Sequence, residues 1–277
     1  MEDAKEKQEQ TKEKDNIIKE RMARIKHKIV VMSGKGGVGK TTVAVNLAYF
    51  LTLKGKKVGL LDSDLHGPNV VKMLGIEGRE LAVKEGVIEP FEAGYGLKVI
   101  SMALILKSPD EPVIWRGPLK MSVIQQFLND VNWGDLDYLV VDSPPGTGDE
   151  PLSVCQLIPG IDGVVIVTTP QDVAILDSRR AVRFAQKMGI PVIGIIENMS
   201  GFICPYCKKR IDIFKKGGAE KTAKMMEIPF LGYISFSTEM VELSDTGIPF
   251  TSFSERNLAV NREFSDIVEK IEVFTGK

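Results

Sequence analysis

Residues 28–42 decide the fold, and their sequence is KIVVMSGKGGVGKTT. The apolar run Lys28–Ser33 predicts a buried β-strand, and the spacing of Val43, Leu47 and Leu51 predicts a helix after the glycine-rich segment. In that segment successive backbone N–H groups can point at phosphates, and the N-terminus of the helix adds a favourable dipole. A strand, a loop of this pattern and a helix in this order predict a phosphate-binding loop for ATP and Mg²⁺.

The loop fits the pattern G-x-x-x-x-G-K-[ST], which assigns roles to its last two residues. Lys40 is expected to reach the β- and γ-phosphates, and the Thr41 hydroxyl is expected to ligate Mg²⁺. Lys35 is a further cation directly after the first glycine, where a glycine-rich turn has no structural need for one. The loop residues that we expect to bind ATP are Gly34, Lys35, Gly36, Gly37, Val38, Gly39, Lys40, Thr41 and Thr42.

Acidic residues follow two further apolar strands. Asp62 ends one of these strands and Asp64 lies just beyond it, while Asp142 ends the other. In an open α/β sheet, ligands bind at the carboxyl ends of the strands. An apolar strand that ends in an acid is the Walker B form, so Asp142 is expected to hold Mg²⁺ through a water or through Thr41.

Short apolar runs alternate with longer helical patterns along the rest of the chain. This alternation predicts a mostly parallel sheet covered by helices on both faces. The expected fold class is therefore α/β, a single-domain P-loop NTPase. The later strands are expected at Val58–Asp62, Leu97–Met102, Tyr138–Asp142, Gly163–Thr168, Val192–Glu197 and around Phe230–Ile234, and helices at Leu119–Asp130, Val173–Met188 and Gly218–Met226.

Residues 1–27 are rich in Lys, Glu and Gln, and their first half has almost no apolar residues, which predicts disorder. From Ile17 a helical spacing places Ile17, Ile18, Met22 and Ile25 on one face. We therefore expect a charged, partly disordered or helical tail at 1–27 and one ATPase domain at 28–277. The short helix of the tail is expected to lie on the surface of the domain.

Cys204 and Cys207 form a C-x-x-C pair, a spacing that lets both thiolates reach one metal centre. The third cysteine, Cys155, lies in a predicted helix and is expected to pack in the core. A closed site usually needs four ligands, and two chains related by a two-fold axis would supply them. Four interpretations stay open at this point: an iron–sulfur cluster, a zinc ion with the same ligands, a glutaredoxin-like redox pair, and an incidental surface pair.

The loop Gly34–Thr42, with its early lysine, resembles that of the deviant Walker A group of P-loop ATPases. The resemblance implies that Lys35 crosses a nucleotide-sandwiched homodimer and contacts ATP on the other subunit, like an arginine finger. It implies that Asp64 orients the attacking water and that Asp62 lies near the magnesium shell. An Asn side chain suits the adenine edge, and the group places such an Asn where this chain has Asn198. The catalytic residues expected on this basis are Lys35, Lys40 and Asp64.

Nearly all of residues 28–275 resembles the Mrp/ApbC (Nbp-type) iron–sulfur carrier ATPases. This family implies a cytoplasmic homodimer that hydrolyses ATP, binds a bridging [4Fe-4S] cluster through Cys204 and Cys207, and transfers it to apo iron–sulfur proteins. The N-terminal cysteines of the eukaryotic branch are missing, so the short prokaryotic form fits better. The resemblance rests on Gly34–Thr42, Asp62–Asn69, the switch II loop Asp142–Asp149, Thr168–Asp172, Glu197–Phe202 and the two cysteines.

The composition limits the kinds of partner that the protein is expected to bind. A formal net charge of −1 gives no electrostatic reason to expect nucleic acid or an acidic membrane. No apolar run reaches the roughly 18–20 residues that span a bilayer, and the charged N-terminus is unlike a signal peptide. The rival interpretation is a positioning ATPase like MinD or ParA, but the acid-rich segment Glu263–Glu272 is unsuited to anionic lipids.

Overall fold

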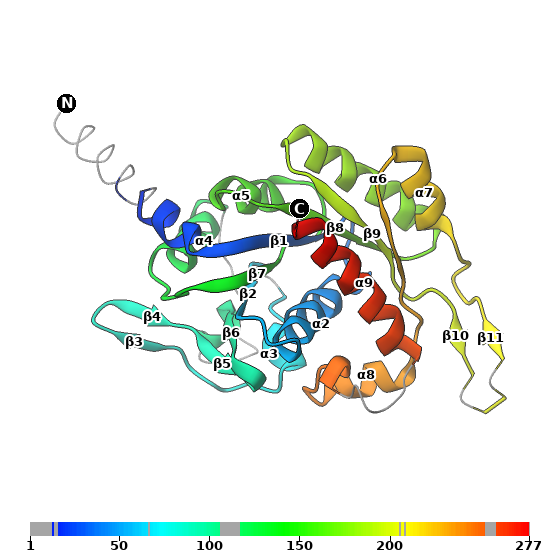
Figure 1. The fold of residues 1–277 in the computed structure, drawn as a ribbon, viewed down its shortest axis with the longest axis horizontal. Helices are drawn as coiled ribbons and strands as arrows, with labels where there is room; N and C mark the ends of the chain where they lie inside the picture. Colours follow the sequence, from blue (N-terminus) through cyan, green and yellow to red (C-terminus); the bar gives the residue numbers. More distant parts are fainter. Residues whose placement is uncertain are drawn as a thin grey trace.

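Apolar strands and helices alternate along the chain, and most of the strands form one main sheet between two layers of helices (Figure 1). The computed structural model describes residues 13, 16–65, 67–105, 117–204, 206–207, 209–252 and 259–276. The strands are β1 (Ile25–Ser33), β2 (Val58–Asp62), β3 (Ala82–Lys84), β4 (Val87–Glu89), β5 (Phe91–Ala93), β6 (Leu97–Ile100), β7 (Leu136–Asp142), β8 (Gly163–Thr168), β9 (Val192–Glu197), β10 (Phe202–Ile203), β11 (Arg210–Ile211) and β12 (Phe230–Tyr233). The helices are α2 (Lys40–Leu53), α3 (Val70–Met73), α4 (Gly117–Asn129), α5 (Asp149–Leu157), α6 (Asp172–Lys187), α7 (Gly218–Met226), α8 (Thr238–Asp245) and α9 (Ala259–Thr275).

The main sheet has eight strands in the order β12-β9-β8-β1-β7-β2-β6-β5. All neighbouring strands in it are parallel except β5, which runs antiparallel to β6. Helical crossovers make the other pairs parallel, because a parallel connection must return the chain to the same end of the sheet. The mostly parallel sheet that the sequence predicts is confirmed.

Each face of the sheet is covered by its own set of helices. Along β1, Ile29 and Val31 pack into one hydrophobic cluster, and Val30 and Met32 pack into the other. The side chains alternate because successive residues of a strand point to opposite faces. The first cluster contains residues of α2, α3, α8 and α9, and the second contains residues of α4, α5, α6 and α7.

The structure differs from the expected elements mainly at their ends and in the small hairpins. β1 begins at Ile25 rather than Lys28, and β6 ends at Ile100 because Ser101 caps a short 3₁₀ turn over Met102–Leu104. The hairpins β3–β4 and β10–β11 and the antiparallel strand β5 were not expected. Each has only two or three residues per strand, too few for a periodic pattern to show.

Residues 16–23 form the short N-terminal helix that the spacing of apolar residues predicts. Ile18 and Met22 are buried in the second cluster together with Ile25, so this helix packs against the domain. The disorder expected for the first half of the tail falls on residues 1–12, which lie outside the described residues.

The C-terminal helix α9 uses its apolar face inside the protein. Phe264, Ile267, Val268 and Ile271 are all buried in the first cluster, against the sheet and α2. The apolar face of this helix is therefore unavailable for a lipid surface in this structure. Within the described residues, no helix has both the length and the apolar character to cross a membrane.

Candidate nucleotide site and cysteine hairpin

The carboxyl ends of the central strands meet at one edge of the sheet, where the predicted site residues come together. The P-loop follows β1, Asp62 ends β2, and Asp142 ends β7. Asp62 and Asp142 are register partners on adjacent parallel strands, which places their backbones side by side. Asn198 follows β9 at the same edge. The geometry is that of an α/β ligand site, at the strand ends where loops and helix N-termini converge.

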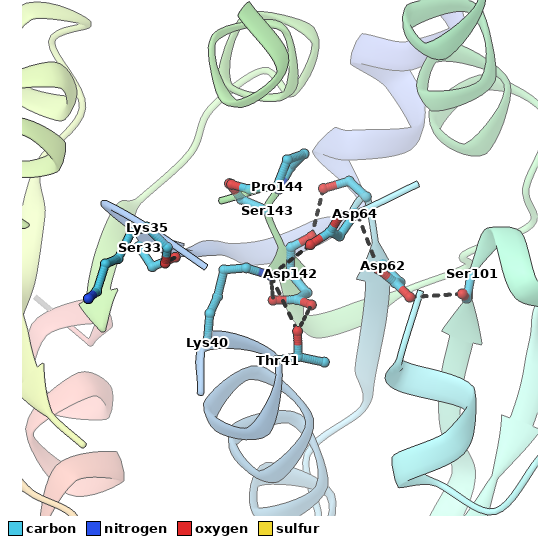
Figure 2. A network of polar contacts seen from close by, with 11 residues as sticks. Ser33, Lys35, Lys40, Thr41, Asp62, Asp64, Ser101, Asp142, Ser143 and Pro144 are labelled. Atoms are coloured by element: carbon cyan, nitrogen blue, oxygen red, sulfur yellow. Dashed lines mark hydrogen bonds and ion pairs between the residues drawn. The ribbon is translucent and has the colours of Figure 1, made fainter. Parts of the chain in front are cut away.

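Lys40 lies at the centre of a buried group of polar side chains (Figure 2). Its ammonium donates to Asp142 Oδ1 at 2.6 Å and lies 3.7 Å from Asp64 Oδ2. The Thr41 hydroxyl donates to Asp142 Oδ2 at 2.7 Å. The P-loop lysine and threonine are thus already in contact with the acid that ends β7.

Asp62 lies beside this group, and it is held by a residue that sequence reasoning missed. The Ser101 hydroxyl donates to Asp62 Oδ2 at 2.8 Å, and the Asp64 N–H donates to Asp62 Oδ1 at 3.1 Å. Both Asp62 and Ser101 are buried. The sequence gives no signal for Ser101, because it lies inside the predicted strand Leu97–Met102 and follows a strand only in the structure, where β6 ends at Ile100.

Asp62, Asp64 and Asp142 place three carboxylates around the single ammonium of Lys40, so negative charge is in excess. The shifted pKa values of Asp62 and Asp142 reflect this excess and the burial of both groups. Burial raises the pKa of Asp62 well above its usual range, and the charge of Asp142 raises it further, against the hydrogen bond from Ser101. Burial also raises the pKa of Asp142, although Lys40 and Thr41 act in the opposite direction. A divalent cation would relieve this excess of buried negative charge.

The donors present fit Mg²⁺, which prefers carboxylate, hydroxyl and phosphate oxygens. Thr41 and Asp142 would hold it, with Asp62 next to its shell. Within the described residues, no group of three or more His, Cys, Asp or Glu side chains forms a ready metal cage. Magnesium here would therefore take ligands from ATP and water, as it does at most nucleotide sites.

Replacing Asp62 with Asn is expected to stabilise the metal-free protein at neutral pH. A carboxyl whose pKa is raised by folding binds more protons in the native than in the unfolded state, so stability falls as pH rises above its usual pKa near 3.8. D62N removes this loss and leaves the other groups in place. In EDTA its melting temperature should exceed that of the wild type by about 2–4 °C for each kcal/mol recovered. The difference should shrink towards pH 4, and an equal difference at both pH values would contradict the explanation.

Two glycines of the loop have no room for a side chain. A Cβ at Gly34 would lie 2.2 Å from the backbone of Asp177 in α6, so the loop packs directly on that helix. Gly39 has φ of 84° and a Cβ there would lie 2.1 Å from the amide nitrogen of Asn198. These contacts explain in physical terms why the loop requires glycine at both positions.

Asn198 lies against the P-loop at the edge of a cavity. Its Nδ2 donates to the Val38 carbonyl at 2.9 Å, and the side chain is buried. The cavity has a volume of about 210 Å³. Its walls combine thioether and aromatic surfaces with a few polar groups: Thr42, Met73, Asn198, Met199, Ser235, Phe236, Ser237, Met240, Val241, Ser244 and Asp245.

Lys35 does not join the carboxylates of its own chain. Figure 2 shows its side chain pointing away from Asp142, while its backbone carbonyl accepts from the Ser33 hydroxyl at 2.9 Å. Within the described residues Lys35 makes no ion pair, in contrast to Lys40. The two lysines of the loop therefore face different surroundings.

Cys204 and Cys207 lie at the turn of the hairpin β10–β11, which extends away from the body of the domain (Figure 1). Cys207 is exposed and Cys204 is half-buried, and neither forms a disulfide within the part of the chain that the structure describes. The hairpin is closed by the Cys204 N–H, which donates to the Lys209 carbonyl at 3.0 Å. His66 and Pro205 lie outside the described residues.

Cys155 is buried in the second hydrophobic cluster, so its expected packing role is confirmed. Burial raises the pKa of its thiol from 9.0 to about 11, so at a given pH it carries about 100-fold less thiolate than an ordinary cysteine.

Alkylation of the native metal-free protein at pH 8 is therefore expected to modify Cys204 and Cys207 and to spare Cys155. Peptide mass spectrometry should find two modified cysteines before unfolding and three in denaturant. Rapid native labelling of Cys155 would contradict the buried placement.

The P-loop, the strand-end acids and the doubly covered parallel sheet define the class of protein as a P-loop NTPase. Residues 24–272 match the ParA family, described as NUBPL iron-transfer P-loop NTPase, and the chain belongs to this family. An iron–sulfur cluster carrier protein of Methanocaldococcus jannaschii is 51% identical over 266 residues, which cover 96% of this chain and 91% of the relative. A cytosolic Fe–S cluster assembly factor NUBP2 homolog of Nematostella vectensis is 43% identical, with 94% and 98% covered.

Solved structures support the same classification. A nucleotide-binding protein from Archaeoglobus fulgidus in complex with ADP is 39% identical and superposes with a TM-score of 0.78, covering 90% of this chain and 96% of that one. The cell division ATPase MinD from Pyrococcus furiosus, at 23% identity and a TM-score of 0.66, shares the fold.

Proposed function

We propose that the protein is a cytoplasmic, homodimeric ATPase that carries a [4Fe-4S] cluster to apo iron–sulfur proteins. The observation that carries the proposal is the presence, in one chain, of a P-loop charge group and a C-x-x-C pair, with Cys207 exposed, at the turn of a projecting hairpin. The names of the relatives, iron–sulfur cluster carrier protein and Fe–S cluster assembly factor, support the same cargo.

ATP would enter with its phosphates on the P-loop and its base in the cavity beside Asn198. Lys40 would leave Asp142 for the β- and γ-phosphates, because a phosphate group carries more charge than a shared carboxylate. Asp142 and Thr41 would then be released to hold the magnesium, which neutralises developing charge during phosphoryl transfer. The cavity beside Asn198 has the apolar walls and few polar groups that suit a flat heterocycle.

Hydrolysis would depend on a carboxylate of the same chain and a lysine of the other. Asp64 lies 3.7 Å from Lys40, close enough to the phosphate position to orient a water. Lys35 points away from its own carboxylates, which is consistent with a contact to ATP on the partner subunit. A cation supplied in this way offsets charge in the transition state.

The cluster is cargo, and one chain offers two thiolates for it. Within the described residues, no third His, Cys, Asp or Glu completes the site. Two hairpins facing each other across a dimer axis would give Cys₄ ligation, which suits a [4Fe-4S] cluster. Exposure of the hairpin would allow a recipient protein to reach the cluster.

Anaerobic reconstitution with iron and sulfide tests the proposal. The expected result is about two iron and two sulfide per chain, dimers in solution, and transfer of the cluster to an apo-ferredoxin. If the purified protein contains zinc and no sulfide, the proposed cluster is wrong and a zinc ion bridges the two chains through the same cysteines. Iron uptake by a monomer would contradict ligation across the dimer. A rival function as a MinD-like or ParA-like positioning ATPase predicts ATP-dependent sedimentation with liposomes or DNA and no iron uptake.

A further inference from the structure

The cavity beside Asn198 and the cysteine hairpin share one wall. Residues 198–201 line or adjoin the cavity and lead directly into β10, which carries Cys204 just beyond its end. Phe236, another residue of the cavity, forms a β-bridge with Phe202 of β10, and the two rings lie 6.0 Å apart between centroids. A molecule in the cavity would therefore press on the base of the hairpin.

Backbone contacts hold this wall in one conformation. The backbone N–H of Asn198 donates to the Thr168 carbonyl at 2.7 Å, and the backbone N–H of Phe236 donates to the Gly201 carbonyl at 2.8 Å. Met199 has φ of 54°, a conformation that non-glycine residues rarely adopt. A segment in such a conformation persists only where its surroundings impose it, and such segments are suited to switching.

Glu197 supports the wall from inside the protein. It is fully buried, and its carboxylate accepts from the Ser200 hydroxyl at 2.7 Å, from the Gly217 N–H at 2.9 Å and from the Ala219 N–H at 2.8 Å. The last two donors lie at the N-terminus of α7, where a negative charge is favoured. Nucleotide chemistry uses none of these contacts.

Arg210 is the side chain that ties the hairpin to the wall. It lies on β11, the second strand of the hairpin, and its Nη2 donates to the Ser200 carbonyl at 2.7 Å. Its guanidinium also covers Gly201 so closely that a Cβ there would lie 2.5 Å from Nη2. The hydrogen bond to Ser200 crosses from the far strand of the hairpin back to the segment that follows Asn198.

We propose that Arg210 is a positioning residue that couples occupancy of the nucleotide site to the placement of Cys204 and Cys207. When the base engages the Asn198 side chain, the hydrogen bond from Asn198 Nδ2 to the Val38 carbonyl is given up. Residues 198–201 then move together. Arg210 and the pair Phe202–Phe236 pass this movement to both strands of the hairpin. The nucleotide state would thus change how the thiols are presented. The inference rests on the proposed function for its purpose, but its test does not need a cluster.

The test measures alkylation of Cys207 in the metal-free protein, with and without Mg²⁺ and a non-hydrolysable ATP analogue. Peptide mass spectrometry reads the rate at Cys207 alone. In the wild type the analogue should change this rate by about fivefold or more, the lower end of coupling between linked sites. In Arg210→Ala the change should disappear while the affinity for the analogue and the rate of ATP hydrolysis stay near those of the wild type.

Matched variants separate coupling from general loosening of the hairpin. Lys209→Ala removes the neighbouring exposed cation and should keep the nucleotide effect. Arg210→Lys should restore part of it, because lysine can still donate to Ser200. Phe202→Ala is a second route to the same loss, should Arg210→Ala unfold the hairpin.

Two results would overturn the inference. One is a rate of Cys207 alkylation in the wild type that the ATP analogue does not change; the other is a rate in Arg210→Ala that the analogue changes as much as in the wild type. Neither result depends on iron uptake, so the carrier function would be judged separately by reconstitution.

Discussion

Replacing both Cys204 and Cys207 with serine is expected to abolish iron and sulfide uptake and to leave ATP binding intact. The serine hydroxyls are poor ligands for iron, and within the described residues no other metal-binding side chain completes the site. Among the described residues of the hairpin, none belongs to either buried hydrophobic cluster, so folding should be unaffected. Reconstituted wild type should hold about two iron per chain, and the variant less than about a tenth of that. Visible absorption and iron analysis provide the measurement.

Cys155→Ala is the control for this experiment. It removes the third thiol from the core at a modest loss of stability and should leave iron uptake unchanged. Retention of the cluster by the double variant, or its loss in Cys155→Ala, would mean that the cysteine hairpin is not the cluster site.

Lys35→Ala is expected to lower ATP hydrolysis by about 10³-fold or more, the range for a cation supplied in trans. Binding of ATP should persist, because Lys40 and the backbone of the loop remain. Lys56→Ala, which changes an exposed lysine elsewhere on the domain, should leave the rate unchanged. Steady-state phosphate release and nucleotide affinity separate the two effects.

Mixing two inactive variants tests the direction in which Lys35 acts. A dimer of Lys35→Ala with Asp64→Asn has one site with an intact Asp64 and an intact Lys35 from its partner. Equal mixing should therefore restore about a quarter of the wild-type rate, because half of the dimers are mixed and each has one complete site. If Lys35 acts within its own chain, every mixed dimer lacks a complete site and the mixture stays inactive.

Much of the fold was predictable because its signals are local. The helix Gly218–Met226 and the strands Gly163–Thr168 and Val192–Glu197 have the predicted limits, since apolar runs and glycine positions mark their ends. The small antiparallel pieces were not predictable, because strands of two or three residues contain at most about one and a half periods of the two-residue strand alternation, too few to stand out. β5 joins the sheet through pairing with β6, a contact that no local pattern encodes.

The candidate site divides in the same way. The P-loop, Asp62, Asp142 and the cysteine pair could be named from motifs, because each motif reflects a chemical requirement at fixed spacing. The roles of Ser101, Glu197 and Arg210 were not predicted, because their importance lies in the groups that they hold. A serine after a strand or an arginine in a hairpin has no distinguishing pattern by itself.

By itself the sequence determined that this chain forms a P-loop between a buried strand and a helix, with acids at strand ends and paired thiols. These features follow from local properties of the chain: the conformational freedom of glycine, the burial of apolar runs, and the closeness of thiols that are only three positions apart in the sequence. Only the tertiary structure decided that Lys40 meets Asp142, 102 residues away, and that Asn198 meets Val38, 160 residues away. The physical reason is that such contacts depend on strand order and register across the whole sheet. The same long-range packing brought Phe236 against Phe202 at the base of the cysteine hairpin.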